Sequence, residues 1–93
     1  MTDSGTTQLR DTGARYERDE AGQTTYADYR RTGARLYIDH VFSPPALRGS
    51  GASGRLMDAV SRDARAKGLT ITPICSYAAA WLKRSAEFQD LVA

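Results

Sequence analysis

Apolar and polar side chains alternate most clearly between residues 35 and 41. Leu36, Ile38 and His40 point to one side of an extended chain, and the residues between them point to the other. This period of two predicts a strand with one face turned toward a core. We therefore place His40 on the same face as Leu36 and Ile38, and Asp39 on the opposite face.

Two earlier segments carry residue types that favour strands. Arg15 to Asp19 leads to a Glu-Ala-Gly turn signal, and Gln23 to Arg30 is rich in threonine and tyrosine. Three strands joined by short glycine-containing turns predict an antiparallel meander. Pro44 and Pro45 end the third strand, because proline cannot donate to a strand ladder.

A helical pattern follows, from about Ser53 to Lys67. Leu56, Val60 and Ala64 recur at the spacing of one helix face, and Gly68 suits the end of the helix. The sequence thus predicts an amphipathic helix after the third strand and the glycine-rich stretch that follows it.

The C-terminal third predicts one more strand and one more helix. Leu69 to Ile74 is a short apolar segment, which a right-handed crossover would place parallel to the third strand. Tyr77 to Arg84 predicts the second helix, and a final turn runs to Leu91. The fold class is therefore α+β, in the order β-β-β-α-β-α, with helices packed on a mixed sheet of about four strands.

The N-terminal residues 1–13 are rich in Thr, Ser, Gly and Asp and contain almost nothing apolar. Such a segment cannot offset its ordering entropy by burial, so we predict a disordered tail. The remaining residues, 14–93, suit a single domain.

Composition narrows the classes of function. The chain has a net charge of +2, with acidic residues mixed among the basic ones, so nothing favours nucleic-acid binding. Steep salt dependence of binding to RNA or DNA would identify that alternative. One cysteine and one histidine are too few for a disulfide framework or a structural zinc site, so we expect no metal. The longest apolar run, Tyr77 to Leu82, is too short to cross a bilayer, and without an export signal we expect a cytoplasmic protein with no membrane partner.

The glycine-rich stretch from Arg48 to Gly54 is the main candidate for a binding site. Its glycines match the spacing of a dinucleotide-binding fingerprint, but the preceding strands are predicted to be antiparallel and residues 68–76 contain no acidic residue. We therefore set the dinucleotide fingerprint aside. The backbone N–H groups of this stretch can still converge on an anion at a helix N-terminus. A connection without a ligand is the alternative, and Arg48 favours a phosphate-bearing ligand.

The end of the third strand offers a second feature. If the third and fourth strands diverge there, a wedge of unpaired backbone groups is left. A thin ligand made of amides, such as pantetheine, would complete the pairing as a false strand.

This loop resembles that of the GCN5-related N-acetyltransferases. The segment Arg48-Gly49-Ser50-Gly51-Ala52-Ser53 is similar to their Gln/Arg-x-x-Gly-x-Gly/Ala motif, with serine at the last position. The small Yjdj-type members are similar over a longer stretch, about residues 14–92. They carry a strand ending in a Thr-His-Thr-like segment, a Val-Pro-x-x-Leu-Arg-Gly-x-Gly loop, a Pro-x-Cys segment and a Tyr-x-Ala-Ala-Trp/Tyr helix. The corresponding segments here are 39–41, 42–51, 73–75 and 77–82.

The sequence departs from the small members at two places. Asp39 and Val41 stand where hydroxyl residues are usual, and Ser85 to Phe88 stands where His-Pro-Glu-Tyr is common. The first departure changes the polarity near the expected active site.

The resemblance implies acetyl-CoA as the cosubstrate and an amine, on a small molecule or a protein lysine, as the acceptor. Loop amides would hold the pyrophosphate, pantetheine would lie along the end of the third strand, and the thioester would lie near His40 and Cys75. The residues expected to contact the coenzyme are Val41, Phe42, Arg48, Gly49, Ser50, Gly51, Ala52, Ser53 and Tyr77.

Two side chains are candidates for the chemical step. His40 is a candidate general base, although a half-buried structural histidine is the alternative. Cys75 could accept the acetyl group, line the acyl pocket or act as a small apolar filler.

The leading hypothesis is an N-acetyltransferase in which the amine attacks acetyl-CoA directly. The alternative is a non-catalytic module that binds or senses acyl-CoA. Both a monomer and a homodimer are compatible with the sequence.

Overall fold

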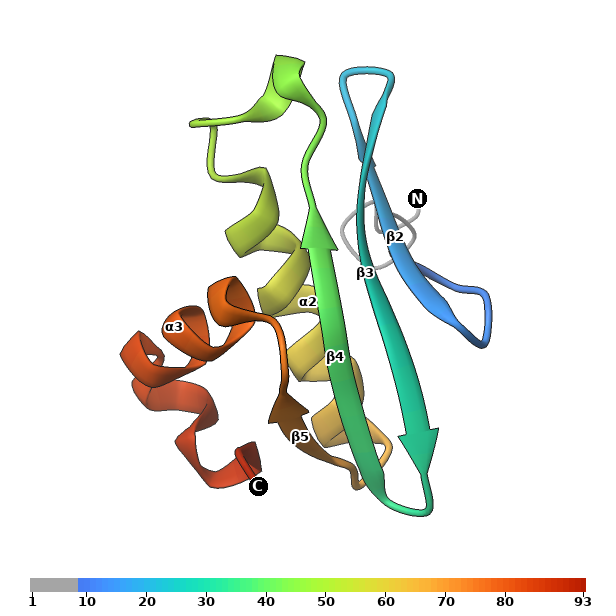
Figure 1. The fold of residues 1–93 in the computed structure, drawn as a ribbon, viewed down its shortest axis with the longest axis vertical. Helices are drawn as coiled ribbons and strands as arrows, with labels where there is room; N and C mark the ends of the chain where they lie inside the picture. Colours follow the sequence, from blue (N-terminus) through green and yellow to red (C-terminus); the bar gives the residue numbers. More distant parts are fainter. Residues whose placement is uncertain (1–8) are drawn as a thin grey trace.

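The computed structural model describes residues 9–93, which form one five-stranded mixed sheet and two α-helices (Figure 1). The strands are β1 (Leu9–Asp11), β2 (Arg15–Glu20), β3 (Gln23–Thr32), β4 (Arg35–Phe42) and β5 (Thr70–Pro73). The helices are α2 (Ala52–Ala66) and α3 (Ser76–Arg84), with short 3₁₀ segments η1 (Pro45–Leu47) and η2 (Ala86–Leu91).

The strands follow one another in sequence order across the sheet. The first four are antiparallel, and β5 is parallel to β4 across the α2 crossover. The predicted α+β class and the parallel pairing are therefore confirmed, with five strands where about four were expected.

The additional strand is β1, which lies at the sheet edge within the segment predicted as a tail. Residues 1–8 of that segment lie outside the described residues. For Leu9–Asp11 the prediction is wrong, because partners distant in sequence hold the segment. Arg10 pairs with Glu17 and Asp19, and Asp11 accepts a hydrogen bond from the hydroxyl of Tyr29.

Helix α2 covers one face of the sheet, as Figure 1 shows. Leu56, Val60 and Ala64 are fully buried, as the helical spacing predicts. They belong to a single apolar core that also takes residues from α3 and η2. Because both helices share this core, the opposite face of β2, β3 and β4 is covered by no helix in the described part of the chain.

A β-bulge shifts the alternation near the end of β4. Asp28 pairs with His40, whereas the next residue of β3, Tyr29, pairs with Ile38, so Asp39 is the extra residue. Val41, instead of His40, therefore packs against the core. The prediction that His40 shares a face with Ile38 is wrong, because one extra residue reverses the direction of every side chain after it.

Candidate functional site

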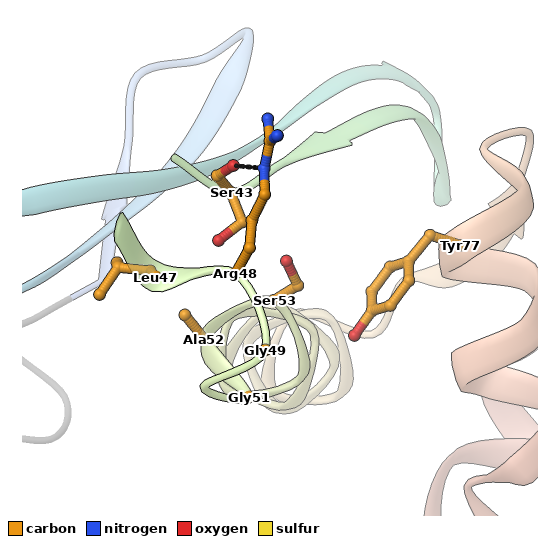
Figure 2. Close-up of a pocket in the computed structure, with 8 residues that line it drawn as sticks. All are labelled: Ser43, Leu47, Arg48, Gly49, Gly51, Ala52, Ser53 and Tyr77. Carbon is orange, nitrogen blue, oxygen red and sulfur yellow. Dashed lines mark hydrogen bonds between the residues drawn. The ribbon is translucent and has the colours of Figure 1, made fainter. Parts of the chain in front are cut away.

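A pocket of about 310 Å³ lies between the end of β4, the glycine-rich loop and the start of α3 (Figure 2). This volume is at the small end for ligand sites, so the pocket can enclose part of an extended ligand. The residues lining it are Ser43, Leu47, Arg48, Gly49, Gly51, Ala52, Ser53 and Tyr77.

The loop conformation depends on two of its glycines. Gly49 has φ +83° and Gly51 has φ +89°, in the left-handed region that residues with a side chain rarely adopt. Gly51 is also the N-cap of α2. The chain thus turns sharply from η1 into the helix and presents its backbone to the pocket.

Several loop amides have no acceptor in the described part of the chain. The first backbone hydrogen bond of α2 runs from Arg55 N to Gly51 O at 3.0 Å. Among residues 9–93 nothing accepts from the amides of Gly49, Gly51, Ala52 or Ser53. Those of Gly51, Ala52 and Ser53 are orphan donors expected at a helix N-terminus, and the first turn contains no acidic residue. The loop can therefore bind an anion through its backbone.

Ser50 differs from its neighbours in the loop. Its amide and its hydroxyl both donate to the carbonyl of Leu47, at 3.1 and 2.6 Å. Ser50 therefore tightens the turn and does not line the pocket.

The Arg48 side chain extends away from Gly49 and Gly51, as Figure 2 shows. Its Nε donates to the carbonyl oxygen of Ser43 at 3.0 Å, and its guanidinium carbon lies 5.7 Å from the centre of the Phe42 ring. Arg48 lines the pocket, but its guanidinium points away from the loop that carries the unpaired amides.

The edge of β4 beside the pocket is free of a partner strand. Pairing with β5 ends where Ile38 meets Pro73, and the amides of Ile74 and Cys75 both donate to Ile38 O, at 2.9 and 3.0 Å. β4 continues to Phe42, so no described strand pairs with residues 39–42 on that side. The expected divergence of the two strands is present.

A loop with unpaired amides and an unpaired strand edge thus lie on either side of the turn between β4 and α2. The sequence model of the GCN5-related N-acetyl-transferases matches residues 15–91. The chain belongs to this family.

A solved structure has a similar fold. The fold is similar to the NMR solution structure of a GCN5-like protein from Staphylococcus aureus, described as a candidate N-acetyltransferase. The TM-score is 0.67 at 24% identity, and the match covers 91% of this chain and 86% of that chain. At this identity the likeness supports the fold. The comparison with curated proteins gave no match.

Val41 and Phe42, expected to contact the coenzyme of this acetyltransferase family, point to opposite faces of the sheet. Val41 packs against the core, and the Phe42 ring stacks on Tyr26 at 5.0 Å on the face without helices. Neither side chain lines the pocket. Their backbone is what lies at the unpaired edge of β4.

The two candidate catalytic side chains lie on different faces of the sheet. His40 is exposed, and its ring centre lies 6.4 Å from that of Tyr26. Both rings lie on the face of β2, β3 and β4 that no described helix covers, which we call the open face. Cys75 is partly buried and packs against the core. The structure brings both near the point where β5 leaves β4, but it does not bring them together.

Asp39 is engaged on the open face. Arg30 donates two hydrogen bonds to it, at 2.7 and 2.8 Å. This pairing lowers the pKa of Asp39, so the carboxylate remains ionised and is a weak base.

Tyr77 forms the side of the pocket opposite the loop, and its ring points toward the start of α2 (Figure 2). Burial raises the pKa of its hydroxyl, although the side chain is 37% exposed. The hydroxyl is therefore a protonated donor that reaches the pocket.

Sequence reasoning missed Ser43 and Leu47 among the pocket residues. Leu47 is buried and anchors η1. Its position, as an apolar residue between two prolines and a glycine, could have suggested this role. Ser43 had no such signal, because its role depends on where Arg48 turns.

Neither a metal site nor a membrane-spanning helix is found among the described residues. Within 9–93, no three His, Cys, Asp or Glu side chains gather as metal ligands would. Over the same residues, no helix is both long enough and apolar enough to cross a membrane.

Proposed function

We propose that this protein binds acetyl-CoA and transfers its acetyl group to an amine, on a small molecule or a protein lysine. The observation that carries the proposal is the group of unpaired amides at Gly49, Gly51, Ala52 and Ser53, next to the free edge of β4. Membership of the GCN5-related family supports acetyl transfer as the general reaction.

The pyrophosphate of the coenzyme would accept from the loop amides. The N-terminal partial charge of α2, a helix of 15 residues, favours a dianion at this place. The pantetheine arm would then pair with the backbone of residues 39–42, which no described strand occupies on that side. Tyr77 would donate to the ligand from α3.

In the reaction, the amine nitrogen forms a bond to the acetyl carbon and the carbon–sulfur bond breaks. The amine loses a proton, and the departing thiolate of the coenzyme gains one. Backbone amides at the free edge of β4 would stabilise the oxyanion that develops on the way. We assign proton removal to His40, which is exposed on the face that an acceptor can approach.

We assign Cys75 a place in the wall of the acyl pocket. Its side chain packs against the core, on the opposite side of the sheet from His40. A base on one face and a thiol on the other favour direct attack by the amine over an acetyl-cysteine intermediate.

Calorimetric titration of coenzyme A and acetyl-CoA tests the binding step. Two variants form a matched pair, Gly51→Ala in the loop and Gly68→Ala after α2. Both glycines have positive φ, +89° and +72°, so both substitutions strain the backbone. We expect Gly51→Ala to lose at least about tenfold in affinity. Gly68→Ala lowers stability but retains binding, and a folded wild type that binds neither ligand contradicts the proposal.

Turnover separates the enzyme from a non-catalytic acyl-CoA-binding module. The observation that favours the binding module is that Asp39 and Val41 stand where hydroxyl residues are usual, with Asp39 engaged by Arg30 and Val41 packed against the core. Release of free coenzyme thiol in the presence of a panel of amines, including a lysine peptide, supports the enzyme. Tight acetyl-CoA binding without acetylation of any amine supports the binding module.

A further inference from the structure

The end of β4 and the glycine-rich loop are tied together by one side-chain hydrogen bond. Arg48 Nε donates to the carbonyl oxygen of Ser43 at 3.0 Å (Figure 2). The two residues that follow Ser43 are Pro44 and Pro45, which have no backbone N–H to offer. The guanidinium supplies a donor that the local backbone lacks.

The segment between them is a short, ordered turn. The amide of Leu47 donates to Pro44 O at 2.9 Å, and the amide of Arg48 donates to Pro45 O at 3.2 Å. Leu47 is buried and holds this turn against the body of the protein. Residues 43–48 and the Arg48–Ser43 hydrogen bond therefore form a closed ring, in addition to the backbone hydrogen bonds of the turn.

This ring separates the two walls of the pocket. Ser43 lines it from the strand side, and Gly49 and Gly51 line it from the loop side. The Arg48–Ser43 hydrogen bond therefore links the loop that carries the unpaired amides to the end of β4.

Within residues 9–93, the charge of Arg48 has no partner of opposite sign. Most other arginines pair with carboxylates, as Arg30 does with Asp39 and Arg55 with Glu20, but no carboxylate within residues 9–93 pairs with Arg48. The side chain is exposed and extends away from the loop amides. Its placement fits a structural donor better than a counter-ion for phosphate.

We propose that Arg48 is a positioning residue, which acts through its Nε–H on Ser43 to hold the loop and β4 at the spacing that the ligand needs. This inference rests on the proposed function for its ligand, acetyl-CoA. It reassigns Arg48, which sequence reasoning had placed among the groups that contact the coenzyme.

Two neutral substitutions separate the donor from the charge. In Arg48→Gln the side-chain nitrogen occupies the same place along the chain as Arg Nε and can donate to Ser43 O. In Arg48→Met a methyl carbon occupies that place and cannot. Both variants lose the positive charge, so a difference between them comes from the polar amide end of Gln and not from the charge.

The expected result is that Arg48→Gln binds coenzyme A roughly three- to tenfold more tightly than Arg48→Met, the range that one hydrogen bond contributes. Equal affinities of the two variants, both weaker than wild type, would show that the charge matters and would overturn the inference. Equal affinities of all three proteins would overturn it as well.

Amide hydrogen exchange tests the same contact without any ligand. The amides of Leu47 and Ser50 are bonded inside the turn. We expect them to exchange roughly three- to tenfold faster in Arg48→Met than in Arg48→Gln, because the ring opens more often. Unequal exchange with no coenzyme binding by the wild type would retain the positioning role and reject the proposed ligand. Equal exchange in the two variants would reject the positioning role.

Discussion

Gly54 lies against the indole ring of Trp81. A Cβ atom built on Gly54 would lie 3.2 Å from Trp81 Nε1 and 3.7 Å from the hydroxyl oxygen of Tyr77. Gly54 was one of three glycines that matched a nucleotide-binding spacing in the sequence. Its role in the structure is to let α2 and α3 approach each other behind the pocket, whereas Gly49 and Gly51 provide the turn itself.

Enlarging this position should disturb the helix contact. We expect Gly54→Leu to destabilise the protein by about 1–3 kcal/mol, because the added side chain has no room beside the indole. Urea unfolding measures the loss, and the emission of Trp81, the single tryptophan, reports its altered environment. Ala66→Leu, at an exposed position of the same helix, is the control. Equal stability of the two variants would mean that the helices do not meet as described.

The hydroxyl of Tyr16 ties β2 to the last turns of α2. It donates to Asp63 Oδ2 at 3.0 Å, and Tyr16 is 1% exposed. Burial, and next the charge of Asp63, raise the pKa of Tyr16 far above its ordinary value, so the donor stays protonated. We expect Tyr16→Phe to cost about 0.5–1.5 kcal/mol, seen as a lower urea midpoint at unchanged slope. Tyr37→Phe, on the open face, is the control and should change stability little.

Acid should weaken the attachment of β1. Burial alone would raise the pKa of Asp11, but hydrogen bonds from Tyr29 and Gly13 and the ammonium of Lys67 lower it below 3.8. The folded state therefore binds fewer protons than the unfolded state. The stabilisation is complete above pH 3.8 and is lost as the pH falls through the lower folded value. Asp11→Asn should be less stable than wild type at neutral pH, with the difference narrowing below about pH 4. Parallel stability curves across that range would contradict this account.

Removal of the imidazole tests the assignment of the base. If acetyl transfer is observed, we expect His40→Gln to lower kcat by about 10²- to 10⁴-fold. Asp39→Asn is the comparison, because Arg30 already occupies that carboxylate. A larger loss of kcat in Asp39→Asn than in His40→Gln would transfer the role of base to Asp39.

The local pattern of apolar residues predicted the order of strands and helices well, because strand alternation and helix spacing depend only on residues close in sequence. The bulge at Asp39 could not be predicted this way. It adds one residue without breaking the apolar–polar pattern, and so reverses the face of His40. Likewise, β1 depends on ion pairs of Arg10 with residues of β2, and the direction of Arg48 depends on the carbonyl of Ser43. Each of these outcomes is set by a contact in space, which the alternation and spacing of apolar residues do not reveal.

Ser53, which replaces the usual small apolar residue of the family's loop, allows a test in which stability and binding move in opposite directions. Its side chain lines the pocket in the first turn of α2, and that turn has no acidic residue. In Ser53→Asp the new carboxylate interacts favourably with the helix N-terminus and should raise stability by about 0.3–1 kcal/mol. The same carboxylate would repel a bound phosphate and compete for the loop amides. We expect coenzyme A affinity to fall by at least about tenfold and to recover partly at high salt.

Ser53→Asn is the matched control, since it has nearly the same shape as Ser53→Asp and no charge. If the loop amides hold phosphate, the aspartate variant is the more stable of the two and the weaker binder. If the substitutions instead distort the loop in general, both variants bind coenzyme A more weakly to the same extent, and both are less stable than the wild type. If the two bind coenzyme A equally well, the phosphates lie elsewhere, because a carboxylate inside this small pocket cannot leave a neighbouring dianion unaffected.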